Sequence, residues 1–131
     1  MPPGPIKALG EIALRVRDLD AMQRFYRSVI GLELLRRFPD AVFFKIADGY
    51  AGHTQVLALF DRRKPLNAEQ TTVDHIAFTV ALKDFEAEKS RLESLGCRLS
   101  FATHEWVHWR SLYLRDPEGN IVELVCHDPS V

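Results

Sequence analysis

Polar and apolar residues alternate from Glu11 to Val16, which predicts a strand with one buried face. A helix should follow, because Asp18 is a good N-cap, apolar residues then recur at three- and four-residue spacing, and Gly31 supplies a stop. Further strand-like runs lie at residues 32–38, 41–46 and 54–60, separated by a Pro-Asp turn and by a glycine-containing loop. The first half therefore predicts the order βαβββ.

The second half repeats this order. Residues 75–80 (HIAFTV) alternate as residues 11–16 (EIALRV) do, and a helix is expected over residues 82–95 before Gly96. The remaining strands are expected at residues 98–101, 111–115 and 121–126. We predict one α+β domain over residues 1–131, with two tandem βαβββ modules forming a cupped mixed sheet. The modules cover about residues 9–60 and 73–127, and the polar stretch 61–72 is the linker.

Composition narrows the classes of partner. The chain has 131 residues and a formal net charge of -1, so it has no excess charge with which to hold nucleic acid or an anionic membrane. It has no apolar run of the roughly 20 residues that a membrane-spanning helix needs. The first ten residues do not resemble a signal peptide, so we expect a cytoplasmic, reduced protein. Cys97 and Cys126 lack CxxC spacing and are interpreted as small core side chains rather than a redox pair.

A duplication relates equivalent positions by an approximate twofold axis, so polar groups at matching positions converge. Glu11 and His75 begin the first strand of each half, and Gln55 and Glu123 lie in the last strand of each half. All four side chains are expected on the concave face that the helices leave uncovered. Carboxylate, amide and imidazole groups all coordinate metal ions, so the four residues form a predicted chelating set.

Aromatic residues cluster just before and within the predicted strand at residues 111–115. Trp106 and Trp109 lie in the segment HEWVHWR, which suits either a flap over a substrate or an interface loop, since tryptophan and arginine are favoured in both. Tyr113 alternates with apolar neighbours, so it lies either in the same cup or on a solvated face.

The whole pattern resembles the vicinal oxygen chelate superfamily, which includes glyoxalase I, methylmalonyl-CoA epimerase, extradiol dioxygenases, fosfomycin-resistance proteins and bleomycin-binding proteins. The matching segments are EIALRVRDLDAMQRFYRSVIGLELL, TQVLALF, DHIAFTV and YLRDPEGNIVELV, which span nearly the whole chain. The resemblance implies the glyoxalase/bleomycin-resistance/dioxygenase fold and a homodimer. It also implies metal ligands on the first and last strands of each module, here Glu11, Gln55, His75 and Glu123.

Such an oxygen-rich set suits Mg²⁺, Mn²⁺, Co²⁺, Ni²⁺ or Zn²⁺. Because Glu11 replaces a histidine, ring-cleaving oxygenation and fosfomycin-type thiol transfer are disfavoured. The resemblance then implies a lyase or isomerase that acts on a small carbonyl compound, or its adduct, through a metal-stabilised enediolate. Glu123 is the first candidate base and Glu11 the second.

Other roles stay open. Arg15 falls where glyoxalase I places an arginine against a glutathione carboxylate, so it is either a contact to a substrate anion or a rim salt bridge. The alternative function is a metal-free protein of the bleomycin-resistance type that binds a small molecule between its modules, with the tryptophans as contacts. An extradiol dioxygenase is the third option.

Overall fold

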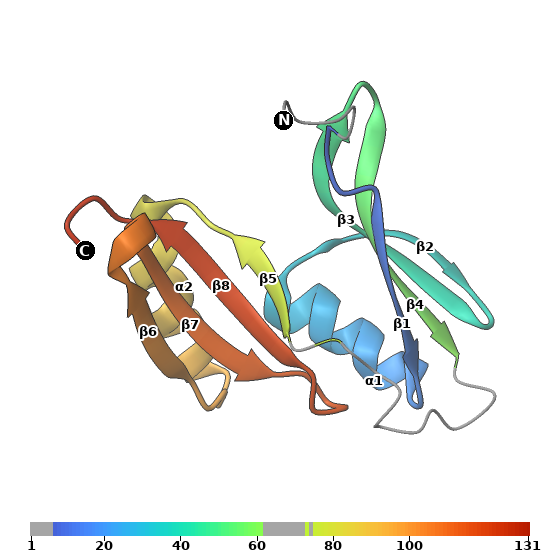
Figure 1. Cartoon of the computed structure of the whole chain (residues 1–131). Coiled ribbons are helices and arrows are strands. Elements are labelled where there is room, and N and C mark those ends of the chain that lie inside the picture. The colour runs from blue at the N-terminus through green and yellow to red at the C-terminus, as the bar shows by residue number, and fades with distance from the viewer. Residues whose placement is uncertain (1–6, 62–72, 74) are drawn as a thin grey trace. The chain divides into compact units, whose positions relative to one another are not determined.

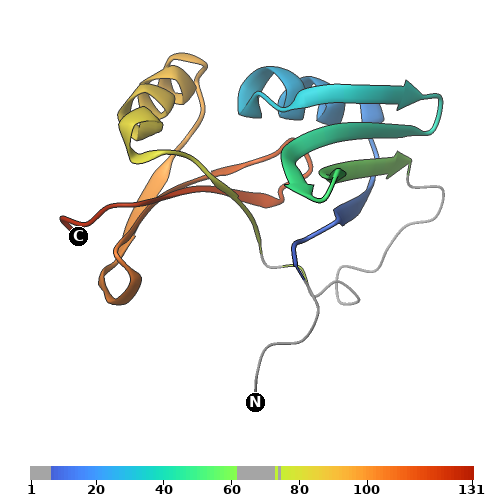
Figure 2. The same cartoon turned by 90° about the horizontal axis from the view of Figure 1, so that it is seen from above.

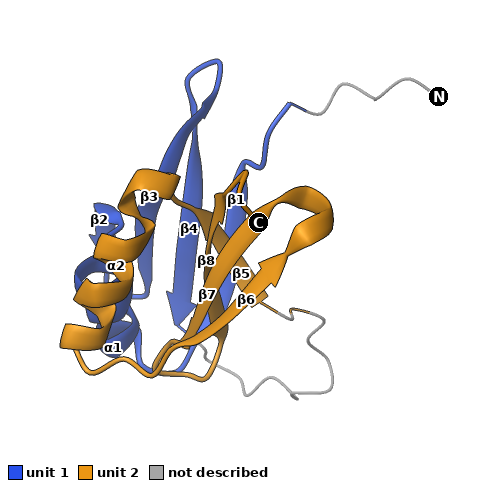
Figure 3. Ribbon diagram, turned by 90° about the vertical axis from the view of Figure 1, so that its left-hand side faces the viewer, with its two compact units in different colours: residues 1–66 blue, residues 67–131 orange. Residues whose placement is uncertain are grey.

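The computed structural model describes residues 7–61, 73 and 75–131 (Figure 1). The chain divides into two compact units, Met1–Leu66 and Asn67–Val131 (Figure 3), each of which is described by itself. Their division falls within the predicted linker at 61–72, of which only Asp61 lies among the described residues. None of the helices in the described parts of the chain is long and apolar enough to span a membrane.

The first unit has the predicted order βαβββ. Its elements are β1 (Glu11–Val16), α1 (Leu19–Arg24), η1 (Phe25–Ile30), β2 (Glu33–Phe38), β3 (Ala41–Tyr50) and β4 (His53–Asp61). The four strands form one sheet in the order β1-β4-β3-β2, in which β1 and β4 are parallel and the other neighbours antiparallel.

The first helix begins and ends where the sequence predicts. The Asp18 carboxylate caps it by accepting a hydrogen bond from the backbone N–H of Ala21 at 3.0 Å. Gly31 ends it in the left-handed conformation, with φ of 91°. The last six residues differ from the expected α-helix because they form the wider π-helical turn η1. The helix packs against one face of the sheet (Figure 2). Its side chains Met22 and Tyr26 are completely buried.

The core of the first unit lies between this helix and the sheet. Phe44 and Leu57 are fully buried, and the ring of Tyr26 lies 6.3 Å from that of Phe44. Strand alternation places Glu11, with Ala58 and Phe60, on the other face, which we call the helix-free face. It is lined by aromatic rings, since Phe43 makes edge-to-face contact with Phe38 and with Phe60.

The hairpin between β3 and β4 is longer than predicted. The expected loop is instead strand as far as Tyr50 and from His53, and the two residues pair. Gly49 makes this possible, because its φ is +74° and a side chain there would collide with the backbone carbonyl of His53. A register shift between Lys45 and Ala47 accompanies the extension.

The second unit repeats the βαβββ order. Its elements are β5 (His75–Thr79), α2 (Leu82–Ser94), β6 (Ser100–His104), η3 (Glu105–Val107), β7 (Trp109–Arg115) and β8 (Ile121–His127). The sheet order is β5-β8-β7-β6, the same arrangement as in the first unit. The strand expected at residues 98–101 starts two residues later and continues to His104.

Helix α2 covers one face of this sheet (Figure 2) and buries Phe85 and Leu92. The segment DPEGN between β7 and β8 is the tight turn that the sequence predicts. The Asp116 carboxylate closes it by accepting hydrogen bonds from the backbone N–H groups of Glu118 and Asn120, both at 2.9 Å. The turn fixes the register of β8 against β7, and β8 carries the residue around which the candidate site is built.

Candidate metal site on the second sheet

Glu123 is the centre of the candidate site. It is a carboxylate with only 5% of its surface exposed, on the helix-free face of the second sheet. Its Oε1 lies 3.1 Å from Nε2 of the exposed His75, and its Oε2 accepts a hydrogen bond of 2.6 Å from the Ser111 hydroxyl. A buried carboxylate requires such partners, because leaving it unpaired would be costly.

Strand pairing brings these side chains together. Glu123 pairs with Ala77 on one neighbouring strand and with Tyr113 on the other, while His75 pairs with Ile121. His75 is therefore the diagonal neighbour of Glu123 on the same face. Ser111 precedes Tyr113 by two residues and so shares that face as well. Ser111 was not among the predicted site residues, although its alternation with Leu112 was a signal for its place on this face.

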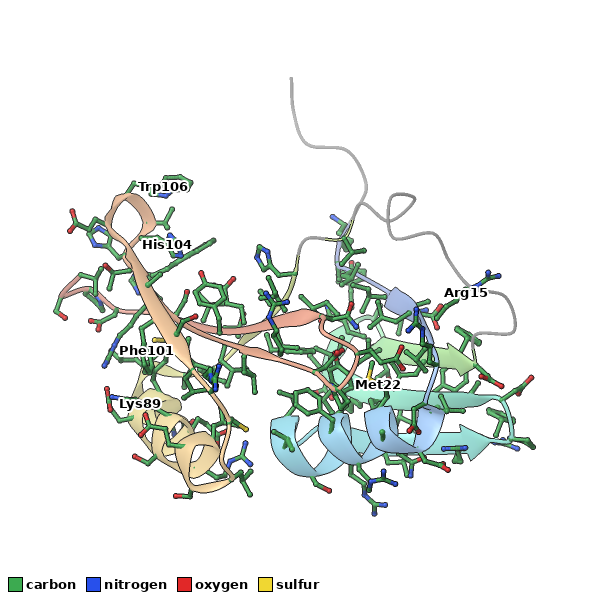
Figure 4. All side chains as sticks on the ribbon, turned by 90° about the horizontal axis from the view of Figure 1, so that it is seen from below. Arg15, Met22, Lys89, Phe101, His104 and Trp106 are labelled. Carbon is green, nitrogen blue, oxygen red and sulfur yellow. The ribbon has the colours of Figure 1, made fainter. Side chains whose placement is uncertain are left out.

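The predicted substrate contacts in this unit differ in their exposure and in the residues beside them. Tyr113 lies beside Glu123, and its hydroxyl is 3.3 Å from Nε2 of His104. Trp109 starts β7 with 44% of its surface exposed, and Trp106 lies at the tip of the β6–β7 hairpin with 85% exposed (Figure 4). The hairpin is tied to the chain's last residues, since Nδ1 of His108 lies 2.6 Å from the Val131 carbonyl oxygen. The roles of the two tryptophans in binding remain predictions.

The first unit places Glu11 and Arg15 on its helix-free face, at the start of β1 and near its end. Both side chains are exposed. Glu11 pairs with Val56 as His75 pairs with Ile121, which supports the predicted equivalence of the two positions. Arg15 forms no salt bridge with any residue that the structure describes. Its role as a substrate contact stays a prediction.

The predicted equivalence of Gln55 and Glu123 is wrong. In the second unit Glu123 pairs with Ala77, which follows His75 by two residues. In the first unit the residue that follows Glu11 by two is Ala13, and it pairs with Ala58. Gln55 lies an odd number of residues from Ala58, so strand alternation puts it on the helix-covered face with Leu57. The side chain of Ala58 has no atom that could bind a metal ion. Of the four equivalent positions, those with a metal-binding side chain are therefore Glu11, His75 and Glu123.

The pair that the structure brings together fits a metal ion. Two donor atoms that bind one cation at about 2.1 Å and at right angles are about 3 Å apart. The separation of 3.1 Å between His75 Nε2 and Glu123 Oε1 is that of an ordinary ion pair and is also compatible with this spacing. Ser111 orients the carboxylate from outside, as residues around metal ligands do. Within the described residues, no three His, Cys, Asp or Glu side chains are grouped so that they could hold a metal ion, and the pair is a partial site.

The two cysteines form no disulfide. Cys126 lies on the helix-covered face of β8, and burial raises the pKa of its thiol above the ordinary value. A raised pKa keeps the thiol protonated and unreactive. This agrees with the interpretation of Cys126 as a core side chain, whereas Cys97 is only half-buried.

We expect Ser111→Ala to weaken binding of a divalent cation about 10- to 100-fold, because the Glu123 carboxylate loses the hydrogen bond that orients it. Competition with a chromophoric chelator measures this affinity. Ser90→Ala, on an exposed turn of α2, is the control and should leave the affinity unchanged. Equal affinities for wild type and Ser111→Ala would show that the hydroxyl does not support a metal ligand.

The chain belongs to the Glyoxalase/Bleomycin resistance protein/Dioxygenase superfamily, whose family profile matches residues 8–124. This confirms the resemblance and the fold that it implied.

Individual relatives have several activities. The chain is 28% identical over 119 residues to glutathione transferase FosA of Serratia marcescens, covering 91% of this chain and 80% of that protein. It is 25% identical to the metallothiol transferase FosB of Staphylococcus epidermidis, over 91% of this chain and 81% of the relative. It is also similar to the solved structure of lactoylglutathione lyase from Agrobacterium tumefaciens, with 33% identity, a TM-score of 0.69 and coverage of 94% and 96%.

Proposed function

We propose that the chain is a divalent-metal-dependent enzyme whose cation is held by Glu11, His75 and Glu123. The observation that carries the proposal is the His75–Glu123 pair at 3.1 Å, with Ser111 orienting the carboxylate. A relative named as a metallothiol transferase supports a metal-dependent activity, and a similar structure named as a lactoylglutathione lyase supports an enzymatic one. With Ala58 in place of a fourth donor, three ligands leave coordination positions for oxygen atoms of a substrate.

We infer that the reaction is that of a lyase or isomerase on a small carbonyl compound or its adduct. When bound, the cation supplies a positive charge that polarises a carbonyl oxygen. The adjacent carbon then loses a proton to a carboxylate. Glu123 is buried and held by two partners, so its fixed position suits a ligand. Glu11 is exposed at the start of its strand and is freer to carry a proton. We therefore propose Glu11 as the first candidate base, with Glu123, the first candidate of the sequence analysis, as the alternative.

Metal dependence is the test of this proposal. Protein stripped with a chelator and then desalted is expected to take up a divalent cation, measured by elemental analysis after dialysis. Small 2-oxo and 2-hydroxy carbonyl compounds in D₂O should then exchange the proton next to their carbonyl only with the loaded protein, as followed by proton NMR. Failure to retain any of Mg²⁺, Mn²⁺, Co²⁺, Ni²⁺ or Zn²⁺ would refute the proposal.

A second candidate function is metal-free binding of a hydrophobic or aromatic small molecule. The observation in its favour is the exposure of Trp106 and Trp109 on one hairpin. Tryptophan fluorescence titrated with aromatic ligands, with and without chelator, separates the two functions. Quenching that chelator does not change, in a protein that retains no cation, would favour the binding function. The homodimer and the cytoplasmic location remain predictions of the sequence.

A further inference from the structure

A cavity of about 640 Å³ lies in the second unit, at the end of the sheet where β5 and β8 begin. His75, one of the proposed ligands, forms part of its wall, together with Tyr113, Ile121 and two arginines, Arg98 and Arg115. The volume is within the range of small-molecule sites, which is about 300–1,000 Å³.

The register of the sheet places His75, Ile121 and Arg115 side by side on three neighbouring strands. His75 and Arg115 both pair with Ile121, from opposite sides. Neighbouring strands are about 4.8 Å apart, so the backbones at His75 and Arg115 are separated by about 10 Å on the same face. Ser100 pairs with Tyr113, and Arg98 precedes Ser100 by two residues. The chain therefore brings Arg98 toward the Arg115 end of these three residues.

The formal charges on the described residues that line the cavity are all positive. Neither Asp nor Glu is among the described residues that line the cavity, whereas two guanidinium groups are. Two positive charges on the wall of the same cavity repel each other. One N–H of Arg115 is used by the Gly119 carbonyl oxygen at 2.8 Å, and a guanidinium has further donors to offer. A compact anion between the two arginines would offset the repulsion and accept those donors.

We propose that this cavity binds the anionic group of a small substrate through Arg98 and Arg115. The substrate class is a compact organic acid, a carboxylate or a phosphoryl compound, whose anionic end lies at the arginines. Its carbonyl end lies toward His75, and Leu99 and Ile121 contact the short apolar part between them. The placement of the carbonyl end rests on the proposed function, whereas the anion site does not.

The test uses the full chain, stripped of metal and desalted, with inorganic phosphate and malonate as separate probes at constant ionic strength. Backbone amide shifts of residues 96–100 report binding by ¹⁵N NMR. Arg98→Gln is expected to weaken binding of the better probe about tenfold, the value of one charge-assisted hydrogen bond. Arg115→Gln should do the same. The control Lys83→Gln, an exposed charge on α2, should leave the affinity unchanged.

The outcomes are distinct. A preference for phosphate indicates a phosphoryl substrate and a preference for malonate a carboxylate, and either supports the site. Absence of shifts with both probes, or affinities unaffected by both arginine variants, overturns it. Thermal unfolding verifies that each variant is folded, and Arg98→Lys, which keeps the charge, should recover part of the affinity. Because the probes are titrated without metal, an anion site can be confirmed in a chain whose metal proposal has failed, and the reverse.

Discussion

Glu123→Gln is expected to lower the affinity for a divalent cation by more than about 100-fold and to abolish metal-dependent proton exchange. The substitution keeps the size of the side chain but removes the negative charge from the proposed ligand. The new amide oxygen can still accept the hydrogen bond from Ser111, so the fold should be retained. Chelator competition measures the affinity, and proton NMR in D₂O measures the exchange.

Glu93→Gln is the matched control, because it makes the same change of charge at an exposed position of α2 in the same unit. It should bind metal and catalyse exchange as the wild type does. If Glu123→Gln also keeps both properties while its thermal unfolding is unchanged, Glu123 is not a ligand, and the cation is held by other residues.

Phe44→Ala is expected to destabilise the first unit by about 3–5 kcal/mol, because it removes a large, fully buried ring and leaves a cavity. The ring packs beside Tyr26, which anchors the helix to the sheet. Urea denaturation followed by circular dichroism gives the free energy of unfolding.

Phe60→Ala is the control for this substitution. It deletes the same atoms from a ring that is 38% exposed on the helix-free face, so the loss should be less than half as large. Equal losses for the two variants would mean that the helix-covered face is not the principal core of this unit.

The order of helices and strands is predictable from the sequence because alternation and three- to four-residue spacing are strong in both halves. Asp18 and Gly31 mark the ends of the first helix for the same reason, since capping depends on local chemistry. The extended β3–β4 hairpin was not predictable, because its length depends on the conformation of Gly49 and on how two strands pair.

The site was only partly predictable. His75 and Glu123 have adjacent positions on the sheet that follow from alternation and from the turn after Asp116. Gln55 was chosen as a polar residue in the last strand of its half, but it lies three residues before Ala58, and an odd offset puts a strand residue on the opposite face. The cavity involves Arg98, which precedes the first residue of β6, and no sequence pattern places such a residue beside Arg115.

The pairing of Ala13 with Ala58 repeats that of Ala77 with Glu123, so the same backbone ladder supports a methyl group in one copy and a carboxylate in the other. Ladder hydrogen bonds do not involve side chains, so a donor can be gained or lost in one copy while the sheet persists. Each position of the duplicated module thus occurs twice in the chain. In evolutionary terms, the number of donors offered to a cation can change by one substitution, and new specificities become accessible without a new fold.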